Sequence, residues 1–177
     1  MVYLKVFKLH KKICMTIKNT NKFVKTIWFF SEKKRTRKKI FGDIYFKVIL
    51  NILFIKSKNK MLINSYVSIF QRLFFGLLKD FLLFLELRGT GFKFELQDSF
   101  LLLRLGFSHL VNIKILSGIN LIILKTNLII LKSFDLQFLT KFCSQIKRFK
   151  ALDSYKGKGI CYKGTTLILK EGKKTQQ

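Results

Sequence analysis

A two-residue period marks the stretch Phe92-Lys93-Phe94-Glu95-Leu96-Gln97, in which apolar and polar side chains alternate. This is the pattern of a strand with one buried face, and Asp98-Ser99 after it predicts a turn. Residues 100–107 are expected to form the next strand, and residues 109–116 another. Ser117-Gly118 then supplies a further turn. The stretch therefore predicts a run of short strands joined by tight turns.

The strand pattern continues to residue 132 and then changes to that of a helix. Residues 119–125 and 128–132 are expected to pair around Thr126-Asn127. Beyond them, one helical face is predicted by six side chains at 3.6-residue spacing: Leu136, Leu139, Phe142, Cys143, Ile146 and Phe149. Asp135 is predicted to cap this helix, because a carboxylate there accepts backbone N–H groups. Three cations that suit the negative end of the helix dipole lie at its end: Lys147, Arg148 and Lys150.

The first 80 residues are harder to interpret, apart from a helix near their end. Helical spacing over residues 62–79 places six side chains on one face: Leu62, Tyr66, Ile69, Phe70, Leu73 and Leu77. Before this helix, apolar groups at residues 23–30 and 44–55 alternate with basic clusters, the densest at residues 33–39. Such a cluster predicts a solvated loop or, in a basic protein, an extension that contacts phosphate. The chain therefore reads as strands, helix, strands, helix and a basic tail.

The charge balance is strongly positive. The 177 residues include 35 Lys+Arg against 9 Asp+Glu, a formal net charge of +26. Because 49% of the residues are hydrophobic, the chain is not a disordered basic tail, and its length suits one or two small domains. Self-repulsion opposes the compaction of so charged a domain working alone. A polyanionic partner is therefore expected, either nucleic acid or an acidic membrane surface.

No membrane-spanning helix is expected. A span needs about 18–20 residues with few charges, and the longest stretch without Asp, Glu, Lys or Arg is residues 61–71. The first 15 residues lack the apolar core of a secretory signal and the Arg- and Ser-rich character of a transit peptide. A basic peripheral membrane protein remains the alternative to a nucleic-acid-binding protein.

Groups suited to catalysis or metal binding are scarce. The histidines are His10 and His109 only, beside nine carboxylates. The three cysteines, which form no CxxC pair, are Cys14, Cys143 and Cys161. This spacing predicts free thiols rather than a zinc site or a disulfide framework. Neither a metal nor a cofactor is expected.

Two short motifs resemble parts of enzyme sites without their context. Ser108 and His109 are adjacent, and adjacent residues of a strand point to opposite faces, so His109 would not deprotonate Ser108. A turn or an RNA contact is the preferred interpretation. The triplet Gly89-Thr90-Gly91 is followed by no helix, so it predicts a kink in a strand and not a dinucleotide site. The chain is therefore expected not to be an enzyme.

The segment Tyr155-Lys156-Gly157-Lys158-Gly159 is the most informative basic motif. Glycines let the backbone approach a ligand closely, while the two ammonium groups reach a polyanion such as phosphate. Tyr155 and Tyr162 could stack on exposed bases. The GxxxxGK[ST] spacing of a nucleotide-binding loop is absent, and a flexible surface loop with incidental charge is the open alternative.

Residues 87–174 resemble the C-terminal domain of the bacterial-type large-subunit ribosomal protein six family. The motifs that carry the resemblance, in the family's order and spacing, are Gly89-Thr90-Gly91-Phe92-Lys93, Leu105-Gly106-Phe107-Ser108-His109 with Val111, Gly118-Ile119, Asp135-x-Gln137, Tyr155-Lys156-Gly157-Lys158-Gly159-Ile160 with Tyr162, and Lys170-Glu171-Gly172-Lys173-Lys174. The departures from the family pattern replace usual prolines by Leu110, Leu152 and Ser154, and a usual arginine by Cys161. Cys161 is therefore given no RNA contact by analogy.

The resemblance implies an α+β protein of two tandem related domains, each a small, mostly antiparallel sheet packed against a helix. Residues 1–80 would be a divergent first copy, and residues 81–177 the rRNA-binding copy with its basic tail. The implied role is structural, in the large ribosomal subunit, near the stalk base and the sarcin–ricin loop. Large-subunit rRNA and neighbouring ribosomal proteins would be its partners, with translation factors nearby.

Fifteen residues are predicted RNA contacts on this basis: Lys93, Ser108, His109, Lys147, Arg148, Lys150, Tyr155, Lys156, Gly157, Lys158, Gly159, Tyr162, Lys170, Lys173 and Lys174. The composition also bears on the source of the gene, since the chain has no Pro and a single alanine, Ala151. The abundant Phe, Leu, Ile, Lys and Asn have AT-rich codons, as is common in organellar genomes. Together, this codon skew and the lack of targeting features in the first residues favour a mitochondrial ribosome over that of a plastid.

Overall fold

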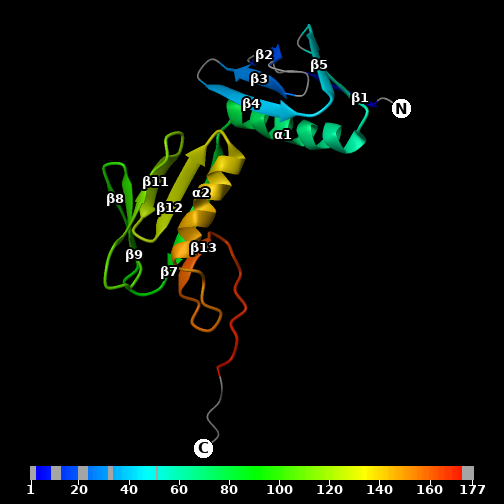
Figure 1. Ribbon diagram of the computed structural model, residues 1–177. Coiled ribbons are helices and arrows are strands. Elements are labelled where there is room, and N and C mark those ends of the chain that lie inside the picture. Colours follow the sequence, from blue (N-terminus) through cyan, green and yellow to red (C-terminus); the bar gives the residue numbers. More distant parts are fainter. Residues whose placement is uncertain (1–2, 9–12, 20–23, 32–33, 51, 173–177) are drawn as a thin grey trace, which may run out of the picture. The chain divides into compact units, whose positions relative to one another are not determined.

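The computed structural model describes residues 3–8, 13–19, 24–31, 34–50 and 52–172. In this part of the chain, small antiparallel sheets are combined with two helices, which confirms the predicted α+β class (Figure 1). The chain forms two compact units, Met1–Asp80 and Phe81–Gln177, called here the N-terminal and the C-terminal unit. Each has its own hydrophobic core.

The N-terminal unit contains two three-stranded antiparallel sheets and one helix. Its elements are β1 (Tyr3–Lys8), β2 (Cys14–Asn19), β3 (Val24–Phe30), β4 (Arg35–Phe41), β5 (Ile44–Ile49), β6 (Ile52–Ser57) and α1 (Lys60–Leu78). The sheets have the strand orders β1-β6-β5 and β2-β3-β4. Their inner faces and α1 enclose the core of this unit, to which Ile27, Phe29 and Phe70 contribute fully buried side chains.

The prediction of a solvated loop at residues 33–39 was wrong, because residues 35–41 form β4. Lysine and arginine occupy positions on both faces of this strand, so the sequence shows no period of apolar residues. In the structure Arg35, Arg37 and Lys39 are exposed, while Ile40 is buried on the opposite face. Long basic side chains tolerate this arrangement because their charged ends reach water.

Helix α1 begins two residues earlier than predicted and ends one residue earlier. The Asn59 side chain accepts a hydrogen bond from the Met61 backbone N–H at 2.9 Å, which caps the first turn. Among the described residues, α1 is the one helix that could cross a membrane by length and composition. The same test is passed by helices that lie in a protein core, and α1 buries Ile63, Phe70 and Leu73 in the core of its own unit. Its length is therefore weak support for a membrane span.

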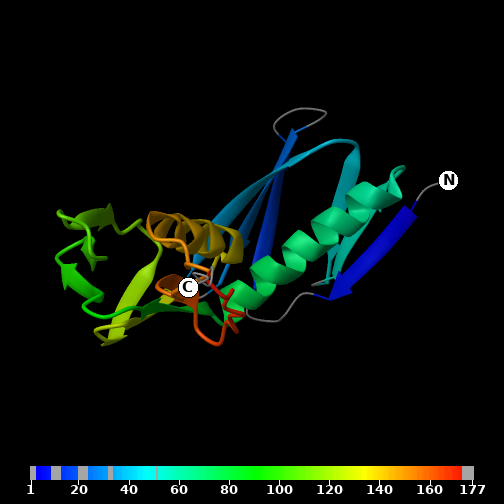
Figure 2. The ribbon, with the colours of Figure 1, turned by 90° about the horizontal axis from the view of Figure 1, so that it is seen from below.

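The C-terminal unit contains a four-stranded sheet, a three-stranded sheet and one helix. Its elements are β7 (Phe81–Arg88), β8 (Lys93–Gln97), β9 (Phe100–Arg104), β10 (Val111–Lys114), β11 (Asn120–Lys125), β12 (Leu128–Ser133), α2 (Leu136–Phe149) and β13 (Gly159–Tyr162). The strand orders are β11-β12-β7-β13 and β10-β9-β8. Helix α2 packs on β7, β12 and β13, and it is viewed from below in Figure 2.

The strands predicted at residues 100–107 and 109–116 are real but shorter. Residues 106–109 form a series of bends between β9 and β10, and Gly106 has a φ of +75°. The argument that Ser108 and His109 point to opposite faces of a strand was therefore wrong. The turn that was the preferred interpretation of His109 is present.

Of the other local predictions for this unit, the hairpin and the helix cap are confirmed, and two more hold only in part. β11 and β12 pair across Thr126-Asn127, with a shift of register between Ile123 and Lys125. The Asp135 carboxylate accepts hydrogen bonds from the backbone N–H groups of Gln137 and Phe138, at 2.9 and 3.3 Å. On the predicted face of α2, Leu139, Phe142, Cys143 and Ile146 are buried, whereas Leu136 is half-buried and Phe149 is 44% exposed. The Gly89-Thr90-Gly91 triplet forms the turn between β7 and β8, where a kink within a strand was predicted.

Candidate nucleic-acid interface

The Lys–Gly motif lies in a loop whose shape is fixed by the Asp153 carboxylate. This group accepts hydrogen bonds from the backbone N–H groups of Tyr155, at 3.0 Å, and Lys156, at 3.2 Å. The Asp153 N–H donates to the Lys158 carbonyl and its own carbonyl accepts from the Gly157 N–H, both at 2.9 Å. With the carboxylate of the loop engaged in this way, the loop presents Tyr155, Lys156 and Lys158 to solvent.

Glycine is needed at the two positions of the motif for different structural reasons. Gly157 has a φ of +66° in the turn itself, a conformation that favours glycine. Gly159 has a φ of +147° and is buried, and a Cβ placed on it would lie 2.6 Å from the Ala151 carbonyl oxygen. The approach that requires glycine at this position is therefore that of the protein's own backbone.

The end of α2 lies beside this loop and beside the bends at residues 106–109. The Ile160 N–H donates to the Lys150 carbonyl at 2.9 Å, and the Lys147 ammonium lies 5.4 Å from the centre of the Tyr162 ring. The Lys150 ammonium lies 4.6 Å from the centre of the Phe107 ring. These contacts bring together side chains that are far apart in the sequence.

The bends themselves add an exposed imidazole to this surface. The His109 ring stacks on the Phe107 ring, with centroids 5.9 Å apart. The same Phe107 ring makes the cation–π contact with Lys150. Ser108 and His109 are both exposed. The predicted contacts that the structure gathers on one surface, called here the loop surface, are His109, Lys147, Lys150, Tyr155, Lys156, Lys158 and Tyr162, with Arg148 exposed on the last turn of α2.

The remaining predicted RNA contacts lie at the margin of the loop surface or elsewhere. The Lys170 backbone N–H donates to the Ser154 carbonyl at 2.9 Å, which ties the following segment to the loop. Lys93 begins β8 in the three-stranded sheet, where it pairs in register with Arg104. The strand β13, which adjoins the loop surface, belongs to the other sheet of this unit. Lys173 and Lys174 lie outside the described residues.

Sequence reasoning missed Lys163 and Arg88, which flank β13. The Lys163 ammonium lies 5.6 Å from the centre of the Phe84 ring, and the Lys163 N–H donates to the Phe84 carbonyl. The Arg88 guanidinium donates to the Thr165 carbonyl at 2.9 Å. Lys163 could have been predicted from the sequence, because it directly follows the predicted contact Tyr162. The position of Arg88 beside the loop results from the pairing of β7 with β13, which no local pattern in the sequence indicates.

The described residues contain no constellation suited to catalysis. Burial raises the pKa of the Cys143 thiol to about 12, and burial also raises the pKa of Cys161. Both thiols therefore stay protonated at neutral pH and are poor nucleophiles. No group of three or more His, Cys, Asp or Glu in the described ranges could hold a metal ion.

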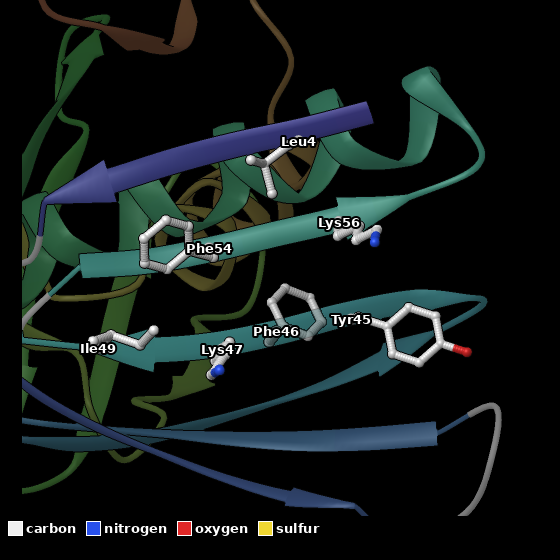
Figure 3. A pocket seen from close by; sticks show the side chains of 7 residues that line it. All are labelled: Leu4, Tyr45, Phe46, Lys47, Ile49, Phe54 and Lys56. Atoms are coloured by element: carbon white, nitrogen blue, oxygen red, sulfur yellow. The ribbon is translucent and has the colours of Figure 1, made fainter. Parts of the chain in front are cut away.

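A hollow of about 450 Å³ in the N-terminal unit has a mainly apolar lining (Figure 3). It lies on the outer face of the sheet β1-β6-β5 and is lined by Leu4, Tyr45, Phe46, Lys47, Ile49, Phe54 and Lys56. The lining has apolar side chains, one phenol and two lysines, and it has no carboxylate, thiol or imidazole.

The order of the Lys–Gly loop is expected to depend on pH. The hydrogen bond from the Tyr155 N–H lowers the pKa of Asp153 most, and the Lys156 N–H and the charges of Lys156 and Lys150 add to this. The stabilisation is present above the pKa of Asp in an unfolded chain, about 3.9, and is lost as pH falls through the lower pKa of the folded state. NMR titration between pH 5 and 2 should show the Tyr155 and Lys156 amide signals moving together. In Asp153→Asn, which keeps an acceptor but no charge, that movement should vanish; its persistence would contradict the assignment.

Comparison with known proteins supplies the family. No protein-family model matches the chain. The chain is 38% identical over 108 residues to "Large ribosomal subunit protein uL6c" of Phaeodactylum tricornutum, which is 61% of each chain. It is 33% identical over 119 residues to the uL6m protein of Reclinomonas americana, 67% of this chain and 64% of that one. With the uL6 protein of Thermosipho melanesiensis it shares 33% identity over 136 residues, 75% of this chain and 74% of the relative.

These matches confirm the resemblance drawn from the motifs. The matched part spans less than two thirds of the length of the first two relatives. The similar proteins are named as ribosomal proteins and not as enzymes, which agrees with the expectation that the chain is not an enzyme. The relatives carry organellar as well as bacterial names. The chain belongs to the uL6 family of large ribosomal subunit proteins.

Proposed function

We propose that this chain is a structural component of the large ribosomal subunit and binds large-subunit rRNA through the loop surface of its C-terminal unit. The observation that carries the proposal is the gathering of Lys147, Lys150, Lys156 and Lys158 around a loop with a single carboxylate. Residues 136–170 contain eight Lys+Arg and one acidic residue, Asp153. That carboxylate is already engaged by two backbone N–H groups.

The chemistry of the loop surface suits the RNA backbone. Ammonium and guanidinium groups neutralise phosphates and release condensed counterions, which gives affinity without reading sequence. Tyr155 is 58% exposed and offers a flat ring on which a base can stack. His109, stacked on Phe107, adds a second ring at the edge of the same surface.

Further parts of the proposal concern the position of the chain in the ribosome, its neighbours there and the organelle. The family resemblance favours a position near the stalk base and the sarcin–ricin loop, with neighbouring ribosomal proteins in contact and translation factors nearby. The AT-biased composition and the uL6m and uL6c relatives support an organellar ribosome, and we propose a mitochondrial one. The two units are proposed to be tandem copies, of which residues 81–177 carry the main rRNA contact.

The test is incorporation into large subunits with two loop charges reversed. Lys156→Glu with Lys158→Glu should reduce co-sedimentation with large subunits in moderate salt and lower the affinity for rRNA about tenfold or more. Two lost phosphate contacts should also lower the magnitude of the slope of log affinity against log salt by about 1.4–1.8. The affinity and the slope can be measured by filter binding to large-subunit rRNA.

The matched control reverses two exposed lysines of the same unit on other strands, Lys114 on β10 and Lys125 on β11. This control should bind nearly as well as the unchanged chain. Equal losses in both double variants would argue for unspecific charge attraction. Purified ribosomes that are complete without the chain, or flotation with anionic vesicles in preference to binding rRNA, would contradict the proposal and favour a peripheral membrane protein.

A further inference from the structure

Most of the positive charge lies outside the unit that carries the loop surface. Residues 1–80 contain 19 Lys+Arg and 3 Asp+Glu, a net charge of +16, whereas residues 81–177 contain 16 and 6, a net charge of +10. A single RNA contact in the C-terminal unit therefore leaves the larger share of the charge unexplained. Charge of one sign opposes compaction unless a polyanion offsets it.

Part of this charge forms a regular row on β4. Arg35, Arg37 and Lys39 occupy alternate positions of the strand, and all three are exposed. Successive side chains of a strand point to opposite faces, so the three lie on one face, away from the buried Ile40. The row runs along the outer face of the sheet β2-β3-β4.

The neighbouring strand places two aromatic rings against this row. In the register of β3 and β4, Trp28 lies opposite Arg37 and Phe30 lies opposite Arg35. The Trp28 and Phe30 rings are nearly parallel, with an interplanar angle of 11° and centroids 6.4 Å apart. The Arg37 guanidinium carbon lies 5.7 Å from the centre of the Trp28 ring. Both rings are half-buried, so part of each remains open to a ligand.

The outer face of the sheet β2-β3-β4 combines positive charge with flat aromatic rings, and both suit a single strand of RNA. Strands β2, β3 and β4 contain no Asp or Glu. Flat rings bordered by cations are the common device for unpaired nucleotides, because bases stack on the rings while phosphates meet the cations. A protein that lies in a membrane interface instead needs a broad apolar face that enters the lipid. On β4 the outward-pointing positions from residue 35 to residue 39 are all cationic, which does not fit such a contact.

We propose that the outer face of the sheet β2-β3-β4 is a second RNA-binding surface, which holds a single-stranded segment. Arg35, Arg37 and Lys39 contact its phosphates, and Trp28 and Phe30 receive its bases. The inference rests on the proposed function for the class of ligand, and it adds a separate site in the N-terminal unit.

The chain supplies its own reporter for this site, because Trp28 is the only tryptophan. The experiment titrates the full-length protein with a mixed-sequence single-stranded RNA of about 12 nucleotides, with selective excitation of tryptophan. Stacking on Trp28 should quench its fluorescence in a saturable way, and RNA held only by the C-terminal unit should not. A duplex of the same sequence should quench it weakly, since its bases are already stacked.

Variants then assign the contacts. Arg35→Gln with Arg37→Gln should weaken the binding seen by Trp28 and lower the magnitude of its salt slope by about 1.4, the value for two phosphates of a single strand. Trp28→Leu should lower the affinity for the 12-nucleotide RNA about fivefold or more, measured by filter binding. The matched control removes two lysines from the outer face of the other sheet, Lys47→Gln with Lys56→Gln, and should leave binding unchanged (Figure 3).

Two results would overturn the inference while leaving the proposed function intact. One is RNA binding by the full chain, seen by filter binding, with no change in Trp28 fluorescence. The other is an equal loss of affinity in the two double-glutamine variants, which would show charge attraction without a defined face. Failure of the unchanged chain to bind large-subunit rRNA at all would instead overturn both proposals. Circular dichroism confirms that each variant is folded.

Discussion

Gly159→Ala is expected to destabilise the C-terminal unit by about 3 kcal/mol or more. A φ of +147° is a conformation that essentially only glycine adopts, and forcing another residue into it costs about 1–3 kcal/mol. The added Cβ would also lie 2.6 Å from the Ala151 carbonyl oxygen and 2.8 Å from the Leu152 Cα. These are backbone atoms that no rotamer change can move, so overpacking adds about 1–3 kcal/mol. Thermal unfolding followed by circular dichroism measures the loss.

The same substitution should weaken RNA binding without changing any charge. Gly159 begins β13, and the neighbouring Ile160 N–H donates to the Lys150 carbonyl. Separation of this strand from residues 151–152 would detach the loop surface from the end of α2. Hydrogen exchange should accordingly rise at the Ile160 amide, and the affinity for large-subunit rRNA should fall.

Gly164→Ala is the matched control, since Gly164 also has a positive φ, +83°, but nothing lies within 4 Å of an added Cβ. It places alanine at a positive φ without a collision and should cost only about 1–2 kcal/mol. If the two alanine variants unfold at the same temperature, the close approach at Gly159 contributes nothing, and its role as a packing glycine is refuted.

The sequence predicted the elements that local chemistry determines. The cap at Asp135 depends on residues two and three positions away, and the hairpin of β11 and β12 depends on the two residues between its strands. Helix α1 was also predicted to within two residues at its start, because its apolar face repeats regularly. In each case the decisive residues lie within one turn or one hairpin of each other.

Strands were expected before α1, but their bounds could not be placed because lysine and arginine hide the period. On β4 the inward positions include Thr36 and Lys38, which are half-buried, so no alternation of apolar residues is visible in the sequence. Lys25 on β3 is itself buried, and its ammonium group donates to the Ile44 carbonyl. The contact of Lys25 with Ile44 exists only once β3 and β5 are brought together by the fold. Burial of such side chains is a tertiary property that composition and periodicity do not report.

The candidate site was predicted as a set of residues, and its arrangement needed the fold. The ring of Phe107 joins Lys150 to His109 across more than 40 positions of sequence. The reason for glycine at position 159 is likewise a contact with Ala151 and Leu152 that no motif shows. The pair of Trp28 and Arg37 on adjacent strands was not singled out at all, because the register of β3 and β4 creates it.

Phe70→Ala is expected to destabilise the N-terminal unit by about 3–5 kcal/mol, the usual cost of removing a fully buried phenylalanine. The Phe70 side chain is completely buried, and its ring lies 5.5 Å from that of Phe29 and 5.7 Å from that of Phe46, centroid to centroid. Removing it leaves a cavity between α1 and both sheets. Because the lone tryptophan, Trp28, lies in this unit, its fluorescence during thermal unfolding reports the N-terminal transition separately from the whole-chain circular dichroism.

Phe75→Ala makes the same chemical change on the same helix at a side chain that is 66% exposed, and it should alter the unfolding free energy by less than about 0.5 kcal/mol. The contrast separates two interpretations of α1. A helix that serves as the core of the N-terminal unit is sensitive on its buried face alone, whereas a helix embedded in lipid is surrounded by apolar contacts. Comparable losses from Phe70→Ala and Phe75→Ala would mean that the exposed face of α1 is covered in the working protein. A loss confined to Phe70 would place the stabilising contacts of α1 within its own unit.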